Sequence, residues 1–170
     1  LVHRDLKPDN VFVAWRPRPR AAAAGDRVAP DRAVVKVLDF GLAKIASEVG
    51  HGPTITRAGV VFGTPEYMAP EQALGQPLDA RSDLYALGAL LYHLLVGEPP
   101  FRATSFIALL RRQVEDAPQP PRARAPDADI DPGLEAVVLR LLAKDPAARF
   151  ASGGEVAAAL RPFADPDALG

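Results

Sequence analysis

The sequence contains no cysteine, which excludes disulfides and thiolate metal sites. Neither sign of charge dominates, because 20 Lys and Arg residues face 21 Asp and Glu residues. This balance argues against a general attraction to nucleic acid, so we expect no nucleic-acid partner. The longest apolar run, residues 86–97, is shorter than the roughly 20 residues that a bilayer requires. We therefore expect no membrane segment in these residues.

The chain begins with leucine instead of methionine, which predicts a piece of a longer polypeptide. Its 170 residues are 48% hydrophobic, enough for one domain with a hydrophobic core. The absence of cysteine fits the reducing cytoplasm, although it would also fit a small secreted domain. We expect a cytoplasmic location and leave open a membrane anchor outside these residues.

Two short runs rich in β-branched residues, 11–13 and 34–38, predict the strands of a small hairpin. Between them, residues 14–33 are mostly arginine, proline and alanine, which predicts an insertion that resembles disordered segments. Two interpretations of this insertion remain open. It is either a basic patch for a partner or a surface loop that is tolerated because loop length costs little free energy.

Nearly every position of 84–96 is apolar, which predicts a central helix that is buried on most sides. Asp79 and Ser82 offer N-cap oxygens before this helix, and Gly97 ends it. We also predict a proline-rich loop over 117–132 and three further helices, over 104–115, over 132–142 and from a capping box at 152–155.

Residues 3–10 read His-Arg-Asp-Leu-Lys-Pro-Asp-Asn and resemble, position for position, the catalytic loop of eukaryotic-type protein kinases. Phosphoryl transfer needs a carboxylate that receives the proton of the substrate hydroxyl, a cation for the migrating group, and ligands for Mg²⁺. The resemblance implies that Asp5 is the base, that Lys7 is the cation that contacts ATP, and that Asn10 is a ligand of Mg²⁺.

Residues 39–41, Asp-Phe-Gly, follow the second predicted strand, where the same family has its metal-binding aspartate. A hard oxygen ligand suits Mg²⁺, and glycine allows the backbone to turn. The resemblance implies that Asp39 binds Mg²⁺ and the nucleotide, whereas Phe40 and Gly41 have structural roles.

Residues 63–71, Gly-Thr-Pro-Glu-Tyr-Met-Ala-Pro-Glu, resemble the substrate-docking loop of the family and its closing Ala-Pro-Glu motif. In serine/threonine-directed members, a threonine at the position of Thr64 lies beside the catalytic aspartate and lysine, so Ser and Thr substrates are implied. The late segment 142–150 resembles the motif whose arginine pairs with the glutamate of Ala-Pro-Glu. The resemblance implies structural roles for His3, Glu71, Asp83 and Arg149.

The loop from 39 to 71 is a candidate phosphorylation switch, centred on Thr56 with Thr54 as the second candidate. Family members with an arginine before the catalytic aspartate, as Arg4 is here, commonly carry a phosphate on this loop, and Lys44 matches a second basic position. A phosphothreonine offers charge-assisted bonds to both cations. The alternative is that Thr54 and Thr56 are ordinary polar loop residues.

Taken together, these motifs resemble the C-terminal lobe of a bacterial-style serine/threonine protein kinase over residues 1–163, followed by a tail at 164–170. The expected fold is mainly α with a small antiparallel β-hairpin. The resemblance implies ATP and Mg²⁺ as cofactors and Ser- or Thr-containing proteins as substrates.

The glycine-rich loop and the strand lysine of the family are absent, because the family places both before the catalytic loop. We therefore expect phosphoryl transfer by the full-length parent and no activity of these 170 residues alone. Two alternatives remain open: a catalytically silent kinase fold that acts as a regulatory or scaffold module, and a truncated gene product without activity.

Overall fold

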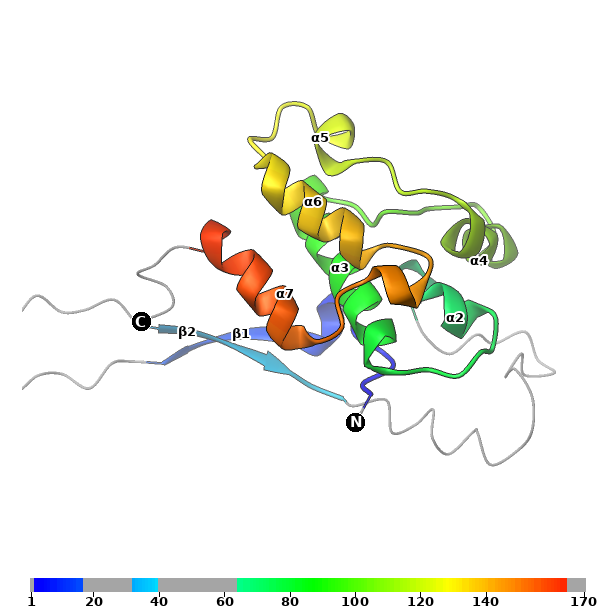
Figure 1. Ribbon diagram of the computed structural model, residues 1–170, viewed down its shortest axis with the longest axis horizontal. Coiled ribbons are helices and arrows are strands. Elements are labelled where there is room, and N and C mark those ends of the chain that lie inside the picture. Colours follow the sequence, from blue (N-terminus) through cyan, green and yellow to red (C-terminus); the bar gives the residue numbers. More distant parts are fainter. Residues whose placement is uncertain (1, 17–31, 40–63, 165–170) are drawn as a thin grey trace, which may run out of the picture.

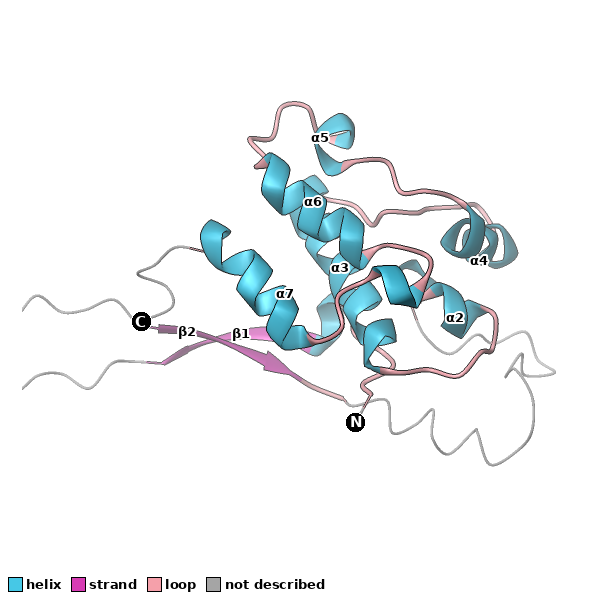
Figure 2. Cartoon of the chain, viewed as in Figure 1, coloured by secondary structure: helices cyan, strands magenta, loops and turns pink. Residues whose placement is uncertain are grey.

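A hairpin of two strands lies along one edge of a body of helices (Figures 1 and 2). The computed structural model describes residues 2–16, 32–39 and 64–164. It confirms the predicted fold class. The strands are β1 (Val11–Arg16) and β2 (Arg32–Val37). The helices are α2 (Pro70–Ala73), α3 (Ala80–Val96), α4 (Phe106–Glu115), α5 (Pro121–Arg124), α6 (Pro132–Leu141) and α7 (Gly153–Leu160). The 3₁₀ turns are η1 (Pro8–Asn10), η2 (Pro65–Tyr67), η3 (Pro146–Ala148) and η4 (Arg161–Phe163).

The hairpin is longer than the sequence predicts. Its ladder runs from Val11 opposite Val37 to Arg16 opposite Arg32, so residues 14–16 and 32–33 are strand and not insertion. The predicted boundaries of 14–33 were too wide, because paired strands satisfy their own backbone groups whatever side chains they carry. The rest of the predicted insertion, 17–31, lies outside the described residues.

Large apolar side chains remain exposed on the hairpin and just after it. Phe12 is 51% exposed, Val13 60% and Val35 64%, and Val37 and Leu38 are also exposed. Because neighbouring residues of a strand point to opposite faces, Phe12 and Val13 place apolar surface on both sides of the hairpin. Contiguous apolar surface of this kind is typical of a region that contacts another part of a protein.

Helix α3 lies at the centre of the helical body (Figure 1), as the apolar run predicts. The side chain of Asp79 caps its first turn, and Gly97 ends it at a φ of 87°, which glycine adopts without strain. The helix begins at Ala80, four residues before the predicted start. Ser82 is therefore not a cap; its hydroxyl lies inside the first turn and bonds to Glu71 instead.

Helix α6 packs against α3, and α7 packs against α6. The contact between α3 and α6 is so close at Gly88 that a Cβ there would lie 2.6 Å from Cβ of Leu141. Tyr67 and Ala69 share a core cluster with Tyr85 of α3, so the end of the predicted docking loop is anchored in the protein interior. No helix in the described ranges is long and apolar enough to cross a membrane.

Three further helices begin at capping residues, of which Ser105, the cap of α4, was not predicted from the sequence. Ser105, Asp131 and Ser152 each accept a backbone N–H from the first turn of α4, α6 and α7. The proline-rich stretch 117–132, predicted as a loop, contains the short helix α5. Pro121 opens α5 at the first helical position, where its missing N–H costs nothing, and its side chain is buried.

Candidate active site

The predicted catalytic loop is held by a carboxylate from helix α3. The N–H of His3 donates to Oδ2 of Asp83 at 2.7 Å, and the N–H of Arg4 donates to Oδ1 at 2.9 Å. From α2, Nε2 of Gln72 donates to the carbonyl oxygen of Arg4 at 3.2 Å. Arg4 itself has a φ of 68°, a conformation that non-glycine residues adopt only when surrounding contacts hold them. Asp83 and Gln72 supply such contacts from two different helices.

Asp5, Lys7 and Asn10, which follow His3 and Arg4 in the sequence, contact one another. Nζ of Lys7 is 3.7 Å from Oδ2 of Asp5, and both side chains are about one quarter exposed, at 22% and 24%. Nδ2 of Asn10 donates to the carbonyl oxygen of Asp5 at 2.8 Å, and Asn10 is buried. The loop therefore presents a carboxylate and a cation to solvent beside an amide whose orientation is set by the backbone.

Leu38 connects this loop to Asp39. Its N–H donates to the carbonyl oxygen of Asn10 at 2.9 Å. Its own carbonyl oxygen accepts a hydrogen bond from Nε2 of His3 at 3.0 Å. Both backbone groups of Leu38 are thus held by the catalytic loop, so the next residue, Asp39, has its position fixed relative to that loop. Asp39 is exposed and has a φ of 54°, which is uncommon outside glycine and typical of strained functional positions.

Thr64 of the docking loop lines a cavity together with Asp5 of the catalytic loop. A small cavity of about 10 Å³ lies between the two loops, and both Thr64 and Asp5 line it. Tyr67 closes another part of its wall, and the Tyr67 ring stacks on His93 with their centroids 6.1 Å apart. Burial, followed by the negative charge of Glu66, raises the pKa of the Tyr67 hydroxyl, so this group remains neutral.

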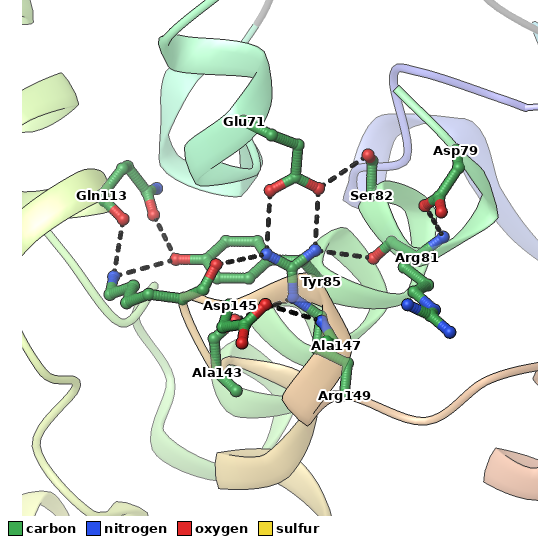
Figure 3. A network of polar contacts seen from close by, with 11 residues as sticks. Glu71, Asp79, Arg81, Ser82, Tyr85, Gln113, Ala143, Asp145, Ala147 and Arg149 are labelled. Carbon is green, nitrogen blue, oxygen red and sulfur yellow. Dashed lines mark hydrogen bonds and ion pairs between the residues drawn. The ribbon is translucent and has the colours of Figure 1, made fainter. Parts of the chain in front are cut away.

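Glu71 and Arg149 form a buried two-bond ion pair (Figure 3). Both bonds are 2.8 Å long, and the two side chains are 6% and 0% exposed. Ser82 donates a further hydrogen bond to Glu71 at 2.7 Å. Burial alone would raise the pKa of the Glu71 carboxyl, but the bonds from Arg149 and Ser82 outweigh it and hold the pKa below its ordinary value.

The guanidinium of Arg149 also forms hydrogen bonds with the surrounding backbone. It donates to three carbonyl oxygens, those of Arg81 at 2.9 Å, Ala143 at 2.8 Å and Lys144 at 3.0 Å. A planar group with five donors can satisfy partners in several directions at once. Arg149 therefore joins α2, α3 and the segment after α6, and so anchors the end of the docking loop.

Sequence reasoning missed several polar residues that hold these loops. Gln72 and Ser82 were not singled out for the contacts described above. Gln113, on helix α4, is fully buried, with an exposed fraction of 0%. Its sequence signal is a polar residue four positions after Leu109, on the face of an amphipathic helix that should be apolar. Lys144 also contacts this region, and burial lowers the pKa of its amine to about 8.

Five predicted site residues lie outside the described residues: Phe40, Gly41, Lys44, Thr54 and Thr56. Of the predicted metal ligands, the structure describes Asn10 and Asp39. No cluster of three or more His, Cys, Asp or Glu side chains that could hold a metal occurs within residues 2–16, 32–39 and 64–164.

The chain is similar in sequence to known proteins. The family model described as "Protein kinase domain" matches residues 1–159. The chain is 49% identical to the serine/threonine-protein kinase pkn3 of Myxococcus xanthus over 89% of this chain and 26% of that protein. It is 39% identical to PknB of Mycolicibacterium smegmatis over 94% of this chain and 22% of that protein. The chain thus spans about a quarter of the length of these curated relatives.

Proposed function

The chain belongs to the protein kinase family, and on this basis we propose that the full-length protein transfers the γ-phosphoryl group of ATP to Ser and Thr side chains of protein substrates. Two observations carry the proposal: Nζ of Lys7 lies 3.7 Å from the Asp5 carboxylate, and Asp5 and Thr64, from two different loops, line the same small cavity. Phosphoryl transfer depends mainly on positioning and on charge stabilisation, and these groups offer both. The relatives reported above come from bacteria, which supports a bacterial type of kinase.

In this proposal Asp5 is the proton acceptor. The substrate hydroxyl oxygen forms a bond to the γ-phosphorus while the bond from that phosphorus to the bridging oxygen breaks, and ADP leaves. The hydroxyl proton passes to the Asp5 carboxylate. Lys7, 3.7 Å away from that carboxylate, stabilises the negative charge of the migrating group. Thr64 lines the same cavity as Asp5 and supports Ser and Thr as the accepting side chains.

Asn10 and Asp39 are the residues that would hold Mg²⁺. Asn10 uses its amide nitrogen to bind the Asp5 carbonyl, which leaves the amide oxygen for a cation. Together with the exposed carboxylate of Asp39, this makes the hard-oxygen donor set that Mg²⁺ prefers. When bound, Mg²⁺ neutralises the charge of the nucleotide phosphates. The strained φ of Asp39 supports a position fixed by function and not by local preference.

The proposed activity is tested by comparing the full-length protein with the 170-residue chain. We expect the full-length protein to transfer labelled γ-phosphate to Ser and Thr of a mixed peptide library, as read by phosphoamino acid analysis. We expect the chain alone to show no transfer and no micromolar binding of Mg-ATP by calorimetry, because part of the nucleotide site lies elsewhere. Phe12 and Val13 are exposed on the hairpin, which supports the proposal that another part of the full-length protein packs against this hairpin.

Either of two results would contradict the proposal. Phosphotyrosine as the main product would exclude the Ser/Thr assignment. Full-length protein that binds Mg-ATP and transfers no phosphate to any peptide would favour a silent kinase fold with a scaffold role. The proposed partners are thus ATP and Ser- or Thr-containing proteins, and the proposed location is the cytoplasm.

Regulation by phosphate on the loop from 39 to 71 is also proposed. A phosphate group on Thr56, or on Thr54, would accept charge-assisted hydrogen bonds from Arg4 and Lys44. Mass spectrometry of the active full-length protein is expected to find phosphate on at least one of the two threonines. The double variant, in which both Thr54 and Thr56 are replaced by alanine, is expected to transfer phosphate more slowly than the wild type. A double variant that works at the wild-type rate, together with unmodified threonines, would rule out this switch.

A further inference from the structure

Gln113 is a fully buried polar residue whose amide N–H groups donate to the predicted docking loop. From helix α4, its Nε2 donates to the carbonyl oxygens of Pro65 at 3.0 Å and Glu66 at 2.9 Å. Its Oε1 accepts the hydroxyl proton of Tyr85 at 2.6 Å (Figure 3). Burial keeps the pKa of Tyr85 above its usual range, so this hydroxyl remains a donor. Both N–H groups and the oxygen of Gln113 are therefore satisfied, which fixes its orientation.

Lys144 holds the end of the helix that carries Gln113. Its Nζ donates to the carbonyl oxygen of Gln113 at 2.6 Å and lies 4.2 Å from the centre of the Phe101 ring. A cation at the last carbonyls of a helix satisfies groups that have no partner within the helix. The carbonyl oxygen of Lys144 in turn accepts a bond from Arg149. Gln113 and the pair of Arg149 with Glu71 thus belong to one continuous polar network.

This network holds the docking loop at two points. Arg149 holds Glu71 at the end of the loop, and Gln113 holds the turn η2 near its beginning. Within that turn the N–H of Tyr67 donates to the carbonyl oxygen of Thr64 at 3.3 Å. A shift of η2 therefore moves Thr64 relative to Asp5, because a backbone hydrogen bond connects the turn directly to Thr64.

Resting on the proposed kinase function, we propose that Gln113 is a positioning residue for the protein substrate. It acts through the carbonyls of Pro65 and Glu66 and keeps Thr64 in place beside Asp5, without touching the nucleotide. An apolar residue of the same size would fill the space but would leave both carbonyls without this buried donor. The polar choice on an otherwise apolar helix face is thereby explained.

Gln113→Glu is the decisive variant, because it keeps the size of the side chain and the acceptor for Tyr85. It replaces the donating nitrogen with an oxygen that faces two carbonyl oxygens. In the full-length protein we expect kcat/KM for a protein substrate to fall about ten- to hundredfold, since small errors in positioning cost that much. The KM for ATP should stay within about twofold, because Gln113 bonds to the docking loop and to Tyr85 and acts on the position of the protein substrate.

Gln119→Glu is the matched control for the added charge. Gln119 is exposed, and its Nε2 donates to the nearby carbonyl oxygen of Ala123 at 3.3 Å. This variant should retain wild-type kinetics. Gln113→Met, which is uncharged and of similar size, separates the loss of the donor from the new charge. It should also lower kcat/KM for the protein substrate and leave the KM for ATP within about twofold. If both Gln113 variants keep the wild-type kcat/KM for the protein substrate, or if the KM for ATP rises as much as kcat/KM falls, the positioning role is wrong.

Hydrogen exchange gives a second readout that does not depend on activity. In the full-length protein, Gln113→Glu should speed exchange of the backbone amides at 66–69, and Gln119→Glu should not. Faster exchange together with an inactive full-length wild type would contradict the proposed function and leave the contact role of Gln113 intact. Unchanged exchange at 66–69 in Gln113→Glu would overturn the inference even if the wild type is an active kinase.

Discussion

Replacing Asp5 with asparagine in the full-length protein is expected to reduce phosphoryl transfer by about a hundredfold to ten-thousandfold, the usual contribution of a positioned acid or base. Asparagine matches the shape of aspartate but cannot accept the proton of the substrate hydroxyl. Initial rates with saturating ATP and protein substrate measure the effect. Binding of Mg-ATP should change much less than the rate, because in our assignment Asn10 and Asp39 hold the metal.

Asp127→Asn is the control for this experiment. Asp127 lies outside the catalytic loop in a turn after α5, is exposed, and loses the same charge when it is replaced. It should work at nearly the wild-type rate, and both variants should melt at the wild-type temperature. An Asp5→Asn variant with near-normal turnover would mean that the proton acceptor is another group.

Arg149→Ala is expected to destabilise the fold by about 3 to 5 kcal/mol, because it leaves the Glu71 carboxylate buried without its partner. For a chain of this size, a loss of that kind corresponds to a fall in melting temperature on the order of 10 °C. Thermal melts of the 170-residue chain followed by circular dichroism measure it. The matched control is Arg111→Ala, since Arg111 pairs with Glu115 at the surface of α4, where both side chains are more than half exposed. That control should melt close to wild type.

The contribution of this pair also depends on pH. The pKa of Glu71 lies below its ordinary value of 4.5 in the folded state, although burial acts in the opposite direction. The stabilisation is therefore fully present above about pH 4.5 and is lost as the pH falls through the lowered pKa. The difference in melting temperature between wild type and Arg149→Ala should shrink in this acid range. A constant difference down to low pH would show that Glu71 is not the group that Arg149 stabilises.

Much of the architecture could be predicted from the order of residues. The helix caps Asp79, Asp131 and Ser152 act within their own first turns, so a local pattern is enough to find them. The apolar run of α3 and the hairpin before residue 39 were also visible in the sequence. The bounds of the strands were not, because the ladder extends as far as both strands can pair and not as far as their β-branched residues reach.

The candidate site divides in the same way. The side chains of Asp5, Lys7, Asn10 and Asp39 indicate phosphoryl transfer from the sequence alone. Proton acceptance, charge stabilisation and Mg²⁺ binding each require particular side chains. Their assembly depends on contacts between residues far apart in sequence. Asp83 anchors the N–H groups of His3 and Arg4 although it lies 80 and 79 positions further along the chain.

The sequence alone determined which groups can carry out the chemistry, which family the chain resembles and where most of its helices start. Only the tertiary structure decided what holds those groups in place: that Ser82 bonds to Glu71 and caps nothing, and that Gln113 reaches the docking loop. The physical reason is range. A cap or an amphipathic pattern is set by neighbours within a turn or two, whereas the partner of a buried polar group is whichever segment the packed core brings against it.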